Sequence, residues 1–218
     1  MGLSSKKNNK RIYFIFKRVM DFLASLLSLI VLSPVLVIIA LAIKLDSKGP
    51  VLFTQKRVGK DKSHFQIFKY RTMKVDAPKD APTHLLENPE EHITQVGRIL
   101  RKTSLDELPQ LFNILRGDMS FVGPRPALWN QYDLIAERDK YGANNIRPGL
   151  TGWAQINGRD ELTIENKAKL DSAYVVAVGI SMDLNCVFGT IFKVIKTDGV
   201  VEGVSHQQEN SQMGEFDK

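Results

Sequence analysis

Two adjacent carboxylates, Asp106 and Glu107, are the residues of this sequence best placed to do chemistry. They lie in the run TSLDELPQLFN, residues 103–113, in which Ser104 stands three residues before Glu107. That spacing predicts a capping box at the start of a helix. The positive end of the helix dipole would keep both carboxylates ionised, a state that suits a nucleophile or a metal ligand. The same spacing is also typical of a plain helix cap, so the neighbouring residues must decide.

Basic residues lie beside turns, strand ends and glycines on both sides of this acidic pair. The guanidinium group of arginine can donate two parallel hydrogen bonds to the oxygens of one phosphate. Arg125 also has a backbone that is stiffened by a proline on either side. A single arginine would be an ordinary surface charge, but a set beside two carboxylates favours diphosphate chemistry. The predicted phosphate and substrate ligands are Lys69, Arg71, Arg101, Arg125, Arg147 and Arg159. Asp106 and Glu107 could hold Mg²⁺ while a phosphorylated substrate completes the shell.

An uncharged apolar run, residues 22–43, is long enough to cross a bilayer core as a helix. Pro34 removes one helix hydrogen bond and predicts a kink, and Ser33 can bond a freed carbonyl and deepen the bend. Residues 1–18 carry only basic charges, and residues 44–62 are mostly basic. Because the positive-inside rule favours the cytoplasmic side for both flanks, the sequence predicts a re-entrant helix. A straight span would satisfy one flank only.

Composition narrows the class of protein. The chain has 218 residues, a formal net charge of +6 and a single cysteine, Cys186. The charge favours an anionic partner, and one cysteine excludes an internal disulfide or a multi-cysteine zinc site. Neither a P-loop nor a dinucleotide-binding glycine motif occurs in the sequence, so those two folds have no support.

The hydrophobic patterns predict an α+β fold. An N-terminal re-entrant membrane helix with a Ser-Pro kink precedes a small mixed cytosolic domain with short strands and amphipathic membrane-associated helices. Residues 51–57 and 65–73 are expected to form a hairpin, and 74–92 a surface loop. Helices are expected near residues 93–102, 104–116, 128–141, 162–178 and 184–195, with turn and strand at 147–159. The predicted organisation is 1–48 for the membrane segment, 49–197 for the catalytic domain and 198–218 for a polar, acidic, disordered tail.

Several motifs follow one another along the chain. They are Lys17-Arg18 with Asp21, Ser33-Pro34, FTQKRVG at 53–59, FKYRTM at 68–73, RKTSLDELPQ at 101–110, GDMSFVGPRP at 117–126 and RPGLTG at 147–152. Over about residues 11–196 this ordered set closely resembles the bacterial sugar transferases. These are the monotopic phosphoglycosyl transferases that initiate capsule, exopolysaccharide, O-antigen and glycoprotein glycan synthesis. The chain resembles the short form of that family.

The resemblance implies that sugar-1-phosphate moves from a UDP-sugar to polyprenyl (undecaprenyl) phosphate, with release of UMP. It implies that Asp106 is the nucleophile, which forms a covalent phosphosugar-aspartate. Glu107 would assist through a metal ion or by handling the acceptor proton. The positions that match phosphate contacts and the break of the re-entrant helix are Lys69, Arg101, Arg125, Ser33 and Pro34.

The resemblance also implies Mg²⁺ as a cofactor and membrane phospholipids as partners. It implies a place at the bacterial plasma (inner) membrane, with the catalytic domain in the cytoplasm. A homodimer stays open, and no nucleic-acid partner is predicted. The sequence departs from the family at Asp171-Ser-Ala-Tyr174-Val, where relatives often read Asp-x-x-Tyr-Tyr. The resemblance therefore assigns nothing to the pocket near Tyr174.

Two other functions stay open on the sequence alone. A membrane-anchored basic scaffold or nucleic-acid-binding module accounts for the charge and the apolar segment, but it leaves the carboxylate pair and Gly-Pro-Arg-Pro unexplained. A glycosyltransferase would use the same donor, move the sugar without its phosphate and release UDP. The nucleotide product therefore separates the two enzymatic interpretations.

Overall fold

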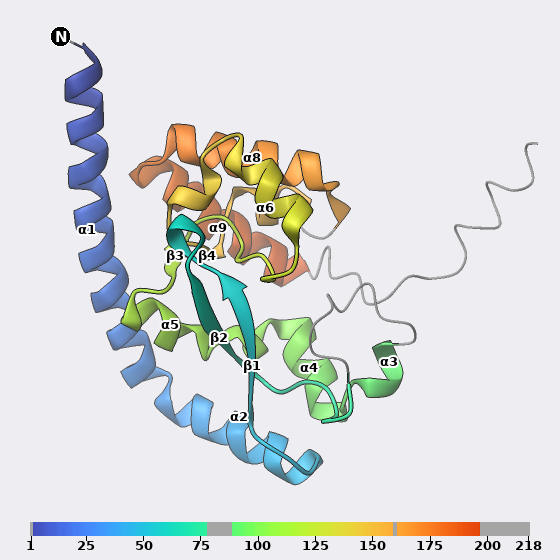
Figure 1. Cartoon of the computed structure of the whole chain (residues 1–218). Helices are drawn as coiled ribbons and strands as arrows, with labels where there is room; N and C mark the ends of the chain where they lie inside the picture. The colour runs from blue at the N-terminus through green and yellow to red at the C-terminus, as the bar shows by residue number, and fades with distance from the viewer. Residues whose placement is uncertain (1, 78–88, 159–160, 197–218) are drawn as a thin grey trace, which may run out of the picture.

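The computed structural model describes residues 2–77, 89–158 and 161–196. Helix α1 (Gly2–Val31) runs along one side of the molecule, and α2 (Ser33–Asp46) continues along its base (Figure 1). The two helices are bent by 63° relative to one another. Pro34 lies in the first turn of α2, and Ser33 Oγ donates a hydrogen bond to Ile30 O at 2.8 Å. The predicted Ser-Pro kink and the serine contact are confirmed.

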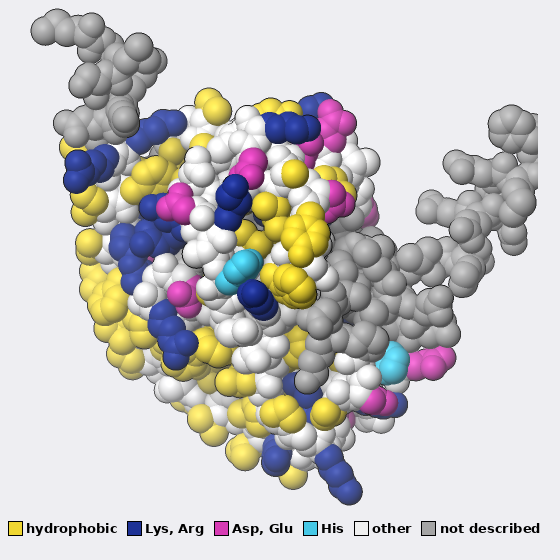
Figure 2. Space-filling model, in the orientation of Figure 1, with side chains coloured by type: hydrophobic (Ala, Val, Ile, Leu, Met, Phe, Trp, Pro, Cys, Tyr) yellow, Lys and Arg dark blue, Asp and Glu magenta, His cyan; other side chains and the backbone are white. Residues whose placement is uncertain are grey.

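The bent helix pair has an apolar outer face and a packed inner face. Leu27, Val31 and Ile38 are largely exposed, and Figure 2 shows hydrophobic side chains along the outer edge of the molecule over α1 and α2. On the inner face, Leu29 and Ile39 belong to buried clusters shared with later strands and helices. Within the described residues no single helix is long and apolar enough to cross a membrane, whereas the bent pair meets that criterion when both halves are taken together.

The predicted hairpin is confirmed. It consists of β1 (Leu52–Val58) and β2 (His64–Tyr70), antiparallel, joined through a 3₁₀ turn, η1 (Lys60–Lys62). Phe53 pairs with Lys69. Because alternate residues of a strand share a face, Gln55 and Arg57 lie on the same face as this pair. The hairpin therefore carries three polar side chains toward one side.

The acidic pair lies in the segment that follows. Its elements are α3 (Pro89–His92), α4 (Gln95–Thr103), a 3₁₀ turn, η3 (Leu105–Glu107), and α5 (Gln110–Arg116). Of the surface loop predicted at 74–92, residues 78–88 lie outside the described residues, and the prediction is wrong at residues 89–92, which form the short helix α3. Helix α5 ends as predicted at Gly117, which has a left-handed φ of 95°. The buried Asn113 amide accepts from Phe68 N at 2.9 Å and donates to Gln66 O at 2.7 Å. It thereby fixes α5 against the strand that carries Lys69.

A short parallel pair, β3 (Ser120–Val122) and β4 (Gly149–Thr151), joins the Gly-Pro-Arg-Pro motif to the later glycine-rich motif. The two backbones approach so closely that only glycine fits. A Cβ at Gly149 would lie 2.1 Å from Gly123 N, and a Cβ at Gly152 would lie 2.0 Å from Gly123 O. Any side chain at these positions would push the two motifs apart.

Helices cover the remaining part of the domain (Figure 1). They are α6 (Tyr132–Asp139), a 3₁₀ turn, η4 (Ala143–Asn145), α7 (Trp153–Ile156), α8 (Ile164–Ala177) and α9 (Ile180–Lys196). The predicted start of the helix at 128 is wrong, because Leu128 pairs with Arg57 as an isolated β-bridge. Of the predicted turn and strand at 147–159, the described part, 147–158, contains one strand, β4, because the chain turns into α7 at Trp153. The two last helices are confirmed.

Basic side chains of α1 attach it to the ends of other helices. Lys10 Nζ donates to Val175 O and Val176 O at the end of α8, and Arg18 donates to two carbonyls at the end of α5. Cations are favourable there because helix C-termini carry unpaired carbonyls and partial negative charge. The α+β class is confirmed, whereas the boundaries at residues 48 and 197 stay predictions. The predicted tail, 198–218, lies outside the described residues.

Candidate active site

The acidic pair lies in a 3₁₀ turn between two helices, so the predicted helix start at residue 104 and the predicted capping box are both wrong, and the helix begins at Gln110. Ser104 ends α4 in a left-handed conformation, with φ 57°, and its side chain makes no capping hydrogen bond. A capping serine needs an extended backbone instead. Glu107 does not reach back to Ser104 because its carboxylate binds two cations, and such charge-assisted bonds are stronger than a cap.

Glu107 is committed to those cations. Its Oε1 accepts from Lys69 Nζ and from Arg125 Nη2, each at 2.8 Å, and the residue is only 9% exposed. Burial alone would raise the pKa of Glu107, but the charges and hydrogen bonds of Arg125 and Lys69 hold that pKa well below its usual range. Glu107 is therefore ionised and fixes both cations in place.

Asp106 has a different environment. It is partly buried and lines a cavity of about 360 Å³, and its side chain has no hydrogen-bond partner among the described residues. Burial raises the pKa of Asp106; Lys69 opposes this, the Glu107 charge adds to it, and Arg101 and Arg125 oppose it. Two neighbouring carboxylates whose environments push their pKa values apart are suited to different roles. Asp106 is the one left available to a ligand.

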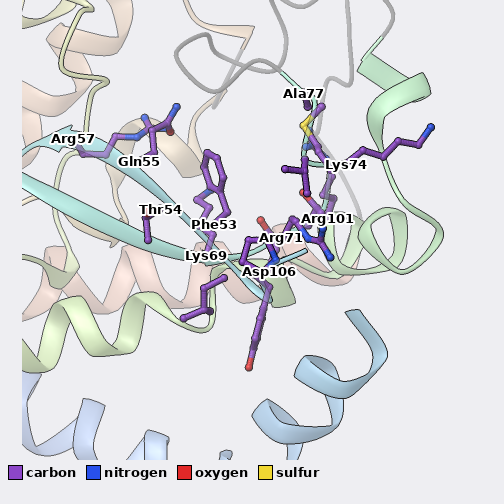
Figure 3. Close-up of a pocket in the computed structure, with 16 residues that line it drawn as sticks. Phe53, Thr54, Gln55, Arg57, Lys69, Arg71, Lys74, Ala77, Arg101 and Asp106 are labelled. Carbon is purple, nitrogen blue, oxygen red and sulfur yellow. The ribbon is translucent and has the colours of Figure 1, made fainter. Parts of the chain in front are cut away.

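The cavity beside Asp106 is formed mainly by the hairpin and the chain that follows it (Figure 3). Lys69 and Arg101 line it next to Asp106, while Arg57 and Gln55 lie farther along β1. The cavity is within the size range of small-ligand sites, about 300–1,000 Å³. A carboxylate among several cations at such a cavity can bind phosphorylated molecules and stabilise charge that develops on phosphate oxygens.

Arg57 is a site residue that the sequence did not single out. Its guanidinium donates to Pro126 O at 3.0 Å and to Gln55 Oε1, while its buried Nε has no hydrogen-bond partner among the described residues. Burial, followed by the like charge of Arg125, lowers the pKa of Arg57 to about 9. An anionic ligand would relieve both conditions. The available signal was its alternation with Phe53 and Gln55 on one strand face.

A buried ion pair between Arg138 and Asp171 holds the backbone of Arg125, and the sequence analysis did not predict this pair either. Arg138 and Asp171 are 3% and 1% exposed. Arg138 Nε donates to Asp171 Oδ2 at 2.8 Å, and Arg138 Nη2 forms an ion pair with the same oxygen at 2.6 Å. The third nitrogen, Nη1, donates to Arg125 O at 2.9 Å. Helices α6 and α8 thereby hold the loop that presents Arg125.

The structure does not bring every predicted residue to this cavity. Arg71 lines its wall, but its guanidinium is buried and donates to Ser47 O and Lys48 O after α2. Arg147 lines a separate cavity of about 1000 Å³ beside α1, where its Nε donates to Gly117 O at 2.8 Å. Arg159 lies outside the described residues. Ser33 and Pro34 lie at the bend between α1 and α2.

In the described part of the chain, Asp106 and Glu107 are the residues at this site that could help to hold a metal ion. Within the described ranges, no group of three or more His, Cys, Asp or Glu side chains could hold a metal ion. Glu107 already uses one oxygen for Lys69 and Arg125. Asp106 and Glu107 therefore fit Mg²⁺ only if substrate phosphates supply further ligands, as is usual for Mg²⁺ bound by one or two carboxylates.

These features define a class: an α+β domain, joined to a bent apolar helix pair, with a cation-surrounded carboxylate suited to phosphate-group chemistry. Residues 12–197 match the family model of the bacterial sugar transferases, and the chain belongs to that family. The family predicted from the ordered motifs is confirmed.

Three relatives illustrate the similarity. The chain is 42% identical over 189 residues to an undecaprenyl-phosphate glucose phosphotransferase of Komagataeibacter xylinus, covering 82% of this chain and 36% of that protein. It is 42% identical over 187 residues to a UDP-glucose:undecaprenyl-phosphate glucose-1-phosphate transferase of Escherichia coli, covering 82% and 40%. It is 39% identical over 189 residues to the exopolysaccharide production protein PSS of Rhizobium leguminosarum bv. phaseoli, covering 81% and 94%. The chain therefore spans well under half of the first two relatives and nearly all of the third.

Proposed function

We propose that this protein transfers sugar-1-phosphate from a UDP-sugar to polyprenyl phosphate and releases UMP, as the first membrane step of capsular or exopolysaccharide synthesis. The observation that carries the proposal is the division of roles in the acidic pair. Asp106 faces a cation-lined cavity with no hydrogen-bond partner among the described residues, while Glu107 is held by Lys69 and Arg125. The names of the relatives support the same donor and acceptor classes.

The reaction takes place in two displacements at one phosphorus. A carboxylate oxygen of Asp106 attacks the sugar-proximal phosphorus, the bond to the bridging oxygen breaks, and UMP leaves with that oxygen. The acceptor phosphate then attacks the phosphosugar-aspartate, and the electron pair of the breaking bond returns to the Asp106 carboxylate. Lys69, Arg101 and Arg125 offset the negative charge on the phosphate oxygens. Glu107 positions two of these cations.

A panel of UDP-sugars with polyprenyl phosphate is expected to give UMP with at least one donor. With donor alone and rapid quench, a peptide that contains Asp106 is expected to gain the mass of the phosphosugar. Release of UDP would instead favour a glycosyltransferase. An unmodified peptide under conditions that release UMP would contradict the covalent route.

Mg²⁺ is the proposed cofactor, held by Asp106 and Glu107 together with the donor diphosphate, whose charge it would neutralise. EDTA is therefore expected to stop UMP release, and added Mg²⁺ to restore it. Because the described part of the site offers only two carboxylates, calorimetric titration with Mg²⁺ alone is expected to detect no tight binding, whereas titration with a UDP-sugar present detects a site. Full activity in chelator would remove the metal from the proposal.

The bent helix pair is proposed to enter and leave a bacterial plasma membrane by its cytoplasmic face. The exposed apolar faces of α1, α2 and α9 would contact phospholipids, with the catalytic domain in the cytoplasm. Basic flanks on both sides of the apolar run support this topology. Single cysteines, Arg11→Cys and Lys60→Cys in a Cys186→Ala background, are expected to react with an impermeant reagent only from the cytoplasmic side. If the two cysteines were labelled from opposite faces of the membrane, the segment would be a straight membrane-spanning helix and the re-entrant topology would be wrong.

A further inference from the structure

A second cavity, of about 280 Å³, adjoins the acidic pair. Glu107 lines it, whereas Asp106 lines the cation-rich cavity, and among the described residues no side chain lines both. Most of its walls are apolar and come from Leu108, Leu111, Phe121, Leu150, Val187 and Ile191. The acidic pair thus stands between a cationic cavity and an apolar one.

The apolar cavity reaches the surface at α9. Val187 and Ile191 line the cavity and are nevertheless 38% and 49% exposed, so this wall is also part of the molecular surface. Around them α9 exposes Leu184, Phe188 and Phe192. A ligand inside the cavity can therefore continue along an apolar helix face, with Lys193, which also lines the cavity, as a charged side chain of α9 beside it.

We infer that this cavity holds the phosphate-proximal isoprene units of the lipid acceptor, with the acceptor phosphate directed past Glu107 toward the cations that Glu107 holds, Lys69 and Arg125. The inference rests on the proposed function, which requires an isoprenoid chain and its phosphate to meet Asp106 together. Burial of isoprene units among leucine, valine and isoleucine side chains is favourable because it removes apolar surface from water.

The size and chemistry of the cavity distinguish this occupant from the nucleotide donor. A uracil ring or a ribose would lose hydrogen bonds to water among these mostly apolar walls and regain few; one atom that could bond them is the buried Gln155 Oε1, which has no hydrogen-bond partner among the described residues. The hydroxyls of Thr151 and Thr190, which also line the cavity, already bond each other. A volume just below that of ordinary ligand sites admits only the first part of a long chain. The rest lies along the exposed face of α9.

The test compares two substitutions on the same helix. Ile191→Glu places a charge on the cavity wall, and Phe188→Glu places the same charge on the exposed apolar face, at a position that does not itself line the cavity. Both side chains are about half exposed, so neither variant buries the charge in the core. In detergent micelles, Ile191→Glu is expected to raise KM for both geranyl phosphate and undecaprenyl phosphate by about 10- to 100-fold. Phe188→Glu is expected to leave KM for geranyl phosphate within about twofold of wild type, because its two isoprene units stay inside the cavity, and to raise KM for undecaprenyl phosphate by less than Ile191→Glu does.

Donor chemistry provides an internal reference. UMP released by donor alone in a single turnover is expected to be unchanged in both variants, because neither residue lines the cationic cavity. Equal increases in KM for geranyl phosphate in the two variants, or an effect of Ile191→Glu on undecaprenyl phosphate without one on geranyl phosphate, would overturn the inference. Either result would show that α9 acts only as a general contact with lipid.

A photoreactive geranyl phosphate with a diazirine in its second isoprene unit tests the site without turnover. Irradiation is expected to label the cavity walls, at Leu150 or at Val187 and Ile191, and undecaprenyl phosphate is expected to compete. Labelling there in a protein that releases no UMP from any UDP-sugar would keep the site and refute the proposed function. UMP release with labelling elsewhere, such as on a second bound polypeptide, would keep the function and overturn the site.

Discussion

Asp106→Asn is expected to lower turnover by about 10⁴-fold or more while the protein stays folded. An amide oxygen is not a useful nucleophile toward phosphorus, so the phosphosugar adduct cannot form. The fold should tolerate the change because the Asp106 side chain has no hydrogen-bond partner among the described residues. Burial also raises the pKa of Asp106, which means that its surroundings disfavour the charge that the substitution removes. UMP release and the thermal unfolding midpoint measure the two effects.

Asp61→Asn is a matched control for this experiment. Asp61 lies on the hairpin turn, is exposed, and has a left-handed backbone that asparagine accepts readily. It makes the same chemical change without touching the cavity, and activity close to wild type is expected. Substantial turnover by a folded Asp106→Asn protein would exclude Asp106 as the nucleophile and return attention to Glu107.

Asp171→Ala is expected to lower the free energy of unfolding by about 3–5 kcal/mol, because it leaves a buried guanidinium without its partner. Arg138 is only 3% exposed, and it spends two of its nitrogens on Asp171. Chemical denaturation in detergent, followed by circular dichroism, measures the loss. A change below about 1 kcal/mol would mean that water reaches Arg138 and that the pair is not truly buried.

The double variant Arg138→Met/Asp171→Leu separates stability from function. Replacing both charges by apolar side chains of similar size is expected to recover most of the lost stability. It cannot replace the hydrogen bond from Arg138 to Arg125 O, which holds the loop that presents Arg125. A folded double variant with a raised KM for the donor is therefore expected. Normal donor kinetics would limit the pair to a structural role.

Features set by short-range interactions could be predicted from the sequence. A proline in the middle of a helix bends that helix, because it lacks a backbone N–H and clashes with the preceding turn, and Pro34 is such a proline. The hairpin and helices α8 and α9 follow from alternation and 3.6-residue periodicity. Gly117 ends α5 because it accepts a left-handed φ. Each of these depends on neighbours within a few residues.

The sequence alone determined the acidic pair, the bent apolar segment and the ordered basic motifs, and hence the family. Only the tertiary structure decided what the two carboxylates do. Ser104 does not cap, Glu107 is bound by cations from the hairpin and from the Gly-Pro-Arg-Pro loop, and Asp106 is left facing the cavity. The tertiary structure also places Arg57 at the same cavity as Asp106 and Arg147 at a different cavity. The physical reason is that ion pairs and burial depend on distances between residues far apart in the chain, which spacing along the sequence does not encode.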